Sequence, residues 1–147
     1  MTIFNDHQLN VAKEQLNLLE KGCHPFQVGT SGPLELTEKQ EKEVQQLVES
    51  LTSAINEYES LQNGTVEPLD YADLTIQNLG VFLVECRIYK HVTQSKMAKT
   101  LGMGLIPFQN MESRFYENAN LTLVKKAVSA LNVDIELIPK LQPDEDE

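Results

Sequence analysis

Two adjacent amide side chains, Gln109 and Asn110, share a predicted helix face with the aliphatic side chains of Leu105 and Ile106. Amides can bond to the exposed edges of bases, asparagine being a natural partner for adenine, and aliphatic groups can contact thymine methyl groups. Nearby polar and cationic side chains suited to phosphate contact are Gln94, Lys96, Lys99 and Arg114. These residue types and spacings favour contact with double-stranded DNA.

Two short helices joined by a tight turn are the elements that must position these side chains. Ala98 leaves room where the two helix backbones cross, and Gly102 tolerates the positive φ that the turn requires. Phe108 and Met111, three residues apart, direct the apolar face of the second helix toward the core. This is the arrangement of a helix-turn-helix, in which the outer face of the second helix enters the major groove.

A pair of longer helices is predicted in the first half of the chain. Apolar residues spaced by three and four predict a helix from about Asp6 to Lys21. A second helix begins at a capping box formed by Thr37 and Gln40 and ends before Gly64. Its apolar seam either packs on the first helix as an intramolecular hairpin or forms a dimer or partner interface. The residues of that interface would be Leu47, Leu51, Ala54, Tyr58 and Leu61.

The chain is predicted to be all-α with two folded parts. It divides into an N-terminal helical hairpin, a linker, a helix-turn-helix domain and an acidic tail, at residues 1–66, 67–74, 75–138 and 139–147. Near the end of the domain, Val133, Ile135 and Leu137 alternate with acidic residues. This alternation predicts either a short C-terminal strand or an extended arm that packs on the body.

The net charge of −10 is unevenly distributed over the 147 residues. Residues 86–126 hold seven cationic side chains against two acidic ones, whereas the remaining parts of the chain are acidic. Because a duplex attracts local positive potential, the net charge does not exclude a DNA partner. It predicts weak affinity unless two copies act together, so we expect a homodimer.

Composition also sets expectations about the compartment. No apolar run reaches the length of a bilayer crossing, and the first ten residues lack the basic and apolar segments of a secretory signal. Cys23 and Cys86 lie far apart and have no paired spacing, so a disulfide framework is not expected. We therefore expect a cytoplasmic protein without membrane contact.

The second half of the chain resembles the lambda-repressor-like helix-turn-helix domains of the Cro/CI, or XRE, type. The run LVECRIYKHVTQSKMAKTLGM is similar to the family's basic first helix, Thr-Gln start, Leu-Ala pair and Leu-Gly end. SALNVDIEL resembles the family's closing Ala-Leu-Gly-Val, and the resemblance covers residues 75–138. It implies a five-helix-type domain and a structural ion pair between Arg87 and Glu112. More loosely, the whole chain resembles regulators with a helical, Glu-rich N-terminal segment, some of them antitoxin-like autorepressors.

The predicted recognition helix departs from the family at its first turn. The family usually has polar residues there, whereas this chain has Leu105, Ile106 and Pro107. Proline is tolerated in a first helical turn because its missing N–H would have no intrahelical partner. The departure leaves Gln109 and Asn110 as the polar candidates for base contact.

Two hypotheses of function follow from these features. The first is a dimeric, sequence-specific transcriptional regulator, a repressor or autorepressor, that binds an operator in double-stranded DNA. The second is an antitoxin-like protein-binding module whose acidic N-terminal half neutralises a basic partner such as a toxin, with DNA binding weak or lost. Histidine, cysteine and serine spacings indicate neither a metal site nor a catalytic site, so we expect no enzyme activity and no cofactor.

Overall fold

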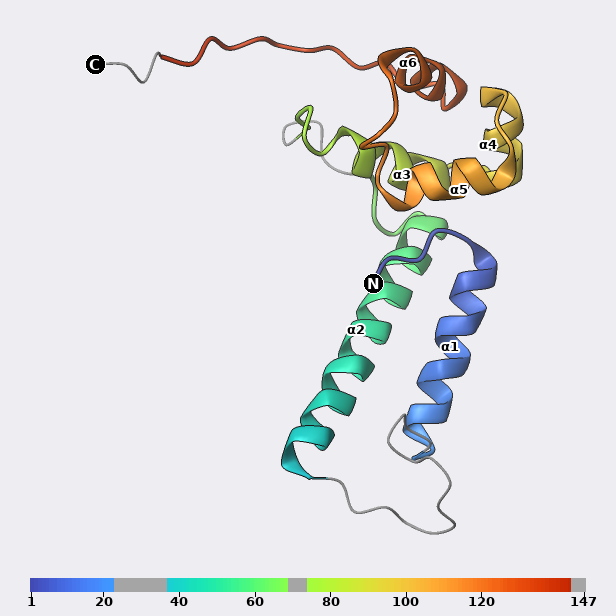
Figure 1. The fold of residues 1–147 in the computed structure, drawn as a ribbon, viewed down its shortest axis with the longest axis vertical. Coiled ribbons are helices and arrows are strands. Elements are labelled where there is room, and N and C mark those ends of the chain that lie inside the picture. The colour runs from blue at the N-terminus through green and yellow to red at the C-terminus, as the bar shows by residue number, and fades with distance from the viewer. Residues whose placement is uncertain (23–36, 69–73, 144–147) are drawn as a thin grey trace.

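The computed structural model describes residues 1–22, 37–68 and 74–143. The helices, which Figure 1 shows in two groups, are α1 (Asp6–Glu20), α2 (Glu38–Gln62), α3 (Leu79–Tyr89), α4 (Gln94–Leu101), α5 (Leu105–Ser113) and α6 (Leu121–Ala130). The predicted all-α class is confirmed for these residues. Most of the predicted linker and the end of the acidic tail lie outside them. Within the described ranges, no helix combines the length and the apolarity that crossing a membrane requires.

Capping side chains start both helices of the hairpin. Asn5 caps α1, its Oδ1 accepting from the backbone N–H of Gln8 at 2.8 Å. At the start of α2 the predicted capping box is confirmed: Thr37 Oγ1 accepts from Gln40 N at 3.2 Å, and Gln40 Oε1 accepts from Thr37 N at 3.1 Å. Such a cap contributes about 1 kcal/mol because it satisfies backbone donors that have no intrahelical partner. Gly64, at φ +76°, follows the end of α2.

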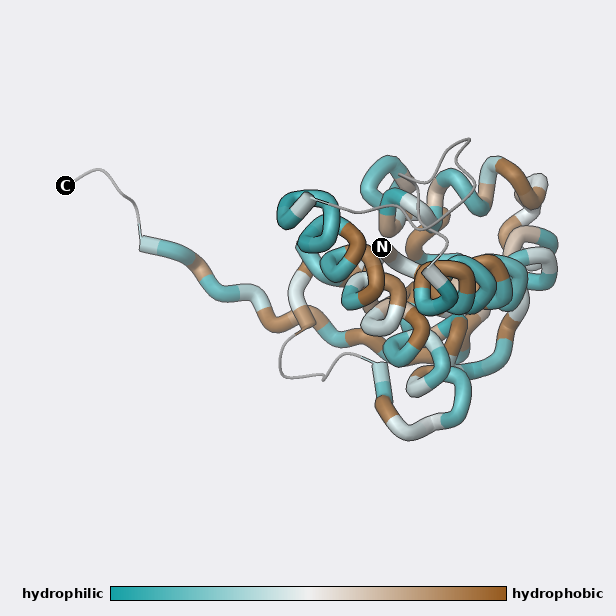
Figure 2. Tube along the Cα trace, turned by 90° about the horizontal axis from the view of Figure 1, so that it is seen from below, coloured by the Kyte–Doolittle hydropathy of each residue, from teal (hydrophilic) through white to brown (hydrophobic). Residues whose placement is uncertain are grey.

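The two long helices pack on each other as an antiparallel hairpin (Figure 1). Figure 2 shows hydrophobic residues recurring among hydrophilic ones along the helical coils, as amphipathic helices require. Four of the five predicted interface residues, Leu51, Ala54, Tyr58 and Leu61, are buried within the chain, and Leu47 is 38% exposed. Of the two predicted alternatives, the structure shows the intramolecular one: the apolar face of α1 packs on the α2 seam and buries most of it.

The hairpin and the helices α3–α6 share one hydrophobic core. Phe82, Phe108 and Leu131 are among its large side chains in the second group, each at most 2% exposed. Ile3 and Phe4, which precede α1, are buried in the same core, and the rings of Phe4 and Phe115 lie 5.7 Å apart. The first residues of the chain thus join the two groups.

The end of the predicted domain differs from the expectation. Residues 75–138 hold four helices rather than a five-helix-type set, and no strand occurs among the described residues. After α6 the chain turns at Asn132, φ +54°, and continues without helix or strand. Val133 and Ile135 pack against the core, whereas Leu137 is 65% exposed, so the extended-arm alternative holds for the first part of this segment only. Apolar residues with a period of two give a helix no continuous face, and a strand needs a partner strand.

Cys86 is a buried free thiol in α3, and we predict that it is unreactive in the native protein. Burial, chiefly, and the charge of Glu85 raise the pKa of this thiol to about 11, and Lys90 opposes them. Because the unfolded thiol has a pKa of about 8.5, its contribution to stability is complete below that pH and is lost as the pH rises toward 11. Iodoacetamide labelling of a Cys23→Ser variant should be slow without denaturant and fast in urea; equal rates would contradict the prediction.

Candidate nucleic-acid interface

The helix pair α4 and α5 is joined by a turn whose geometry follows from its residue types. Thr93 caps α4, its Oγ1 accepting from Lys96 N at 3.1 Å. Gly102 ends α4 in the left-handed region, at φ 72° and ψ 28°, as the sequence predicted. Gly104 then serves as the N-cap of α5. Figure 1 shows α4 standing at a steep angle to α5.

The outer face of α5 carries three of the side chains that the sequence assigned to contact with bases. Leu105 is 41% exposed, Ile106 is 70% exposed, and Asn110 is exposed. On the opposite face, Phe108 and Glu112 are completely buried. Phe108 therefore holds α5 on the core, which leaves the Leu105–Ile106–Asn110 surface available to a ligand.

An ion pair between Arg87 and Glu112, the one that the resemblance implied, fixes α5 against α3. Arg87 Nε lies 2.7 Å from Glu112 Oε2, and Arg87 Nη2 lies 2.7 Å from Glu112 Oε1. The two side chains are 3% and 0% exposed. Arg87 also donates from Nη1 to the carbonyl of Val92 at 2.9 Å and from Nη2 to the carbonyl of Phe4. Bidentate pairing with every group hydrogen-bonded is the geometry in which a buried ion pair is tolerated.

Gln94, predicted as a phosphate anchor, has its amide group engaged inside the protein. The residue is 6% exposed, and its Nε2 donates to Glu112 Oε1 at 2.8 Å. Its Oε1 accepts from Asn5 Nδ2 at 2.7 Å and from Gln109 Nε2 at 3.1 Å. Gln94 thus links the start of α1, the start of α4 and the middle of α5, and it holds the half-buried Gln109 in place.

Asn5 and Phe4 are parts of this network that the sequence analysis missed. Both lie more than eighty positions before their partners, Gln94 and Arg87. The capping role of Asn5 was readable from its place before a helix, but no local pattern signals the second bond that its side chain makes. Such contacts can be identified only from the fold, in which the residues just before α1 lie against Gln94 and Arg87.

A cleft of about 450 Å³ separates the start of α1 from the start of α5. Asp6 and His7 line it on one side, and Leu105 and Gln109 line it on the other. The Asp6 carboxylate accepts hydrogen bonds at Oδ1 from Tyr58 Oη at 2.9 Å and from Gln62 Nε2 at 2.8 Å. One carboxylate, that of Asp6, therefore lies in the cleft beside Leu105 and Gln109, and Arg87, His7 and His91 line the same cleft.

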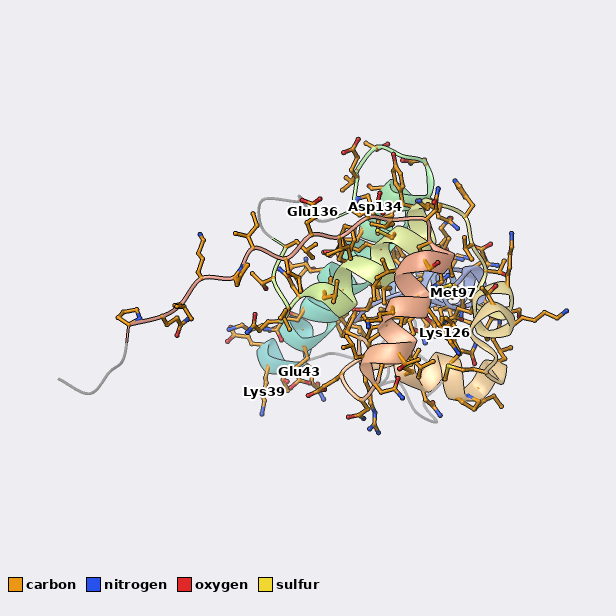
Figure 3. All side chains as sticks on the ribbon, turned by 90° about the horizontal axis from the view of Figure 1, so that it is seen from above. Lys39, Glu43, Met97, Lys126, Asp134 and Glu136 are labelled. Atoms are coloured by element: carbon orange, nitrogen blue, oxygen red, sulfur yellow. The ribbon has the colours of Figure 1, made fainter. Side chains whose placement is uncertain are left out.

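The exposed charged side chains of α4 and of the residue after α5 are all cationic. Lys96, Lys99 and Arg114 are exposed, and the single acid within residues 93–114 is the buried Glu112. The extended segment that carries Asp134 and Glu136 runs to the side of the molecule away from α4 (Figure 1, Figure 3). Lys90 is committed elsewhere, since its Nζ donates to the carbonyl of Leu131.

Tyr116 is 5% exposed, and its hydroxyl finds no hydrogen-bond partner within the described part of the chain. Burial, and secondarily the charge of Glu112, raise the pKa of this hydroxyl. Because burying an unmet hydroxyl costs about 1–3 kcal/mol, we predict that Tyr116→Phe raises the free energy of unfolding by about 1 kcal/mol. Urea denaturation of both proteins measures this; a loss of stability would show that the hydroxyl is hydrogen-bonded.

Comparison with family models, with curated proteins and with solved structures gave no match to this chain. The exposed side chains of α4, α5 and the residue after α5 include an amide, two aliphatic groups and three cations. The cations can pair with anionic groups along the edge of a ligand. The amide and the aliphatic side chains can form hydrogen bonds and apolar contacts with groups in its interior. A nucleic-acid duplex has this pattern of groups.

Proposed function

We propose that this chain is a sequence-specific DNA-binding transcriptional regulator, a repressor or autorepressor, with a lambda-repressor-like helix-turn-helix. The observation that carries the proposal is that the exposed charged side chains of the helix pair are cationic although the chain as a whole is acidic. In a chain of net charge −10, the helix pair exposes Lys96, Lys99 and Arg114, and its one acid is buried against Arg87. Phosphate neutralisation by local cations is what draws such a surface to a duplex.

The proposed roles follow from exposure. Asn110 bonds to a base edge, with adenine as its natural partner, and Leu105 and Ile106 contact thymine methyl groups. Lys96 and Arg114 contact phosphates, which set the register of the protein on the duplex. Gln94 has its amide engaged with protein groups, so it acts by holding Gln109 at the edge of the base-reading face.

Two copies are proposed to act together on half-sites about one helical turn apart. A second copy doubles the number of phosphate contacts, which offsets the weak attraction expected of a single small cationic surface. With most of the α2 seam buried in the hairpin, α1 and α2 themselves offer Val11, Leu18 and Leu47 for self-association, each between 38% and 45% exposed.

DNA selected by the full-length protein from a random-sequence pool provides the test. Binding followed by fluorescence anisotropy should weaken as salt rises, and Asn110→Ala should cost about 1–3 kcal/mol on the selected site. Lys96→Ala should weaken binding to all sequences and lower the salt slope by about one unit. Lys39→Ala is the matched control, since Lys39 lies at the far end of α2 (Figure 3) and should change nothing. Salt-independent binding, or full affinity in Asn110→Ala, would refute the proposal.

A second function, capture of a basic partner protein by the hairpin, is favoured by a specific feature. Val11, Leu18 and Leu47 are exposed on a hairpin whose acids outnumber its bases. Apolar contacts ringed by carboxylates suit a small cationic protein such as a toxin. Co-purification with the product of an adjacent gene, lost in a Leu18→Asp variant, would support this role. Co-purification that survives Leu18→Asp would count against it.

A further inference from the structure

A cavity of about 350 Å³ lies where the hairpin meets the α3–α6 group. Three segments supply most of its lining, namely the residues before α1, the C-terminal half of α2, and α3, and Val66 and Phe115 complete it. Its apolar lining includes Ile3, Leu61, Val81 and Val84. The volume falls within the range of small-molecule sites, and a mostly apolar lining with few polar groups is typical of them.

The charged side chains that line the cavity are all acidic. Glu57 and Glu85 both line the cavity, and no lysine, arginine or histidine appears among the described residues around it. Glu57 is exposed and Glu85 is half-buried, so carboxylates stand at its border with solvent. Tyr58 and Phe115 add two aromatic rings to the lining, and aromatic rings attract cations.

We propose that this cavity binds a small organic cation with an apolar body, such as an aralkyl amine. The apolar body would displace water from the surfaces of Val81, Val84 and Leu61. The ammonium group would remain at the border, where it can donate to the Glu57 carboxylate and lie near an aromatic ring. An anion of the same shape would meet like charge and no donor cation.

The position of the cavity gives such binding a consequence. Ile3 lines the cavity, and the neighbouring Phe4 accepts a hydrogen bond from Arg87. A ligand that contacts α2, α3 and the N-terminal residues together stabilises the junction that also holds Asn5 against Gln94. Binding itself does not depend on the proposed DNA contact, so the two proposals can fail separately.

Titration of the full-length protein with three compounds of one shape tests the proposal. The compounds are 2-phenylethylammonium, 2-phenylethanol and phenylacetate, and the readout is the NMR shift of the methyl groups of Val81, Val84 and Ile3. The ammonium compound should shift these methyl signals with an affinity about fivefold higher than that of the alcohol, and phenylacetate should bind least. Equal binding of all three, or shifts only at other methyl groups, would overturn the proposal.

Two variants localise the site on the same readout. Glu57→Gln should weaken 2-phenylethylammonium binding about threefold and leave the alcohol unchanged. Glu43→Gln, at the far end of the same helix (Figure 3), is the matched control and should alter neither. Ser60→Leu, which adds volume to the lining, should abolish binding of both while far-UV circular dichroism stays unchanged. Unchanged binding in Glu57→Gln and Ser60→Leu would place the ligand elsewhere and refute the site.

Discussion

Replacing Glu112 by alanine is expected to lower the free energy of unfolding by about 3–5 kcal/mol. Glu112 is completely buried, and its carboxylate accepts from both Arg87 and Gln94. Alanine would leave the Arg87 guanidinium in the core without its counter-charge, and the cost of that stranded cation dominates the loss. Since small proteins are stable by only about 5–15 kcal/mol, the variant should be partly unfolded at physiological temperature. Urea denaturation followed by circular dichroism measures the change.

A double-mutant cycle separates the ion pair from the rest of the network. Arg87→Met alone strands the Glu112 carboxylate, and combining it with Glu112→Ala should cost less than the sum of the two single changes. The double variant should still fall short of the original stability, because the carbonyls of Phe4 and Val92 lose the donors that Arg87 supplies. Strict additivity of the two single losses would mean that the pair contributes no coupling.

Local rules predicted the helices well because each depends on residues close in sequence. The Thr37–Gln40 capping box and the left-handed Gly102 both stand where the sequence placed them. The α1 helix ends one residue earlier than predicted, at Glu20. The pairing of Arg87 with Glu112 was also accessible, through a resemblance that linked two positions twenty-five residues apart.

Long-range placement was beyond those rules. Periodicity showed that the α2 seam must be buried but not by which partner, and α1 of the same chain is what covers it. Gln94 looked like an anchor for phosphate because it starts a helix, yet Asn5 and Gln109 occupy its carbonyl oxygen. The alternation after α6 was compatible with a strand, but pairing needs a neighbour that none of the described segments provides.

Gly80→Ala is expected to destabilise the protein by about 3 kcal/mol or more, the upper range for overpacking. A Cβ atom at Gly80, in the first turn of α3, would lie 1.7 Å from the carbonyl oxygen and 2.6 Å from the carbonyl carbon of Phe115. These are backbone atoms, and Phe115 and Tyr116 are both held at positive φ, so neither can turn aside as a flexible side chain would. In most helices the same substitution is favourable by up to about 1 kcal/mol, because alanine has the higher helix propensity.

Because Gly80→Ala is expected to destabilise the protein, whereas the same substitution stabilises most helices, this variant directly tests how closely α3 approaches the end of α5. For a chain of this size, thermal denaturation should show the melting temperature falling by about 10 °C. Gly104→Ala is the matched control, since its Cβ would meet only the Pro107 side chain, at 3.3 Å, and φ there is an ordinary −68°. If Gly80→Ala proved as mild as Gly104→Ala, α3 and the turn after α5 would have to lie further apart. The Arg87–Glu112 pair, which spans the same two elements, would then lose its bidentate geometry.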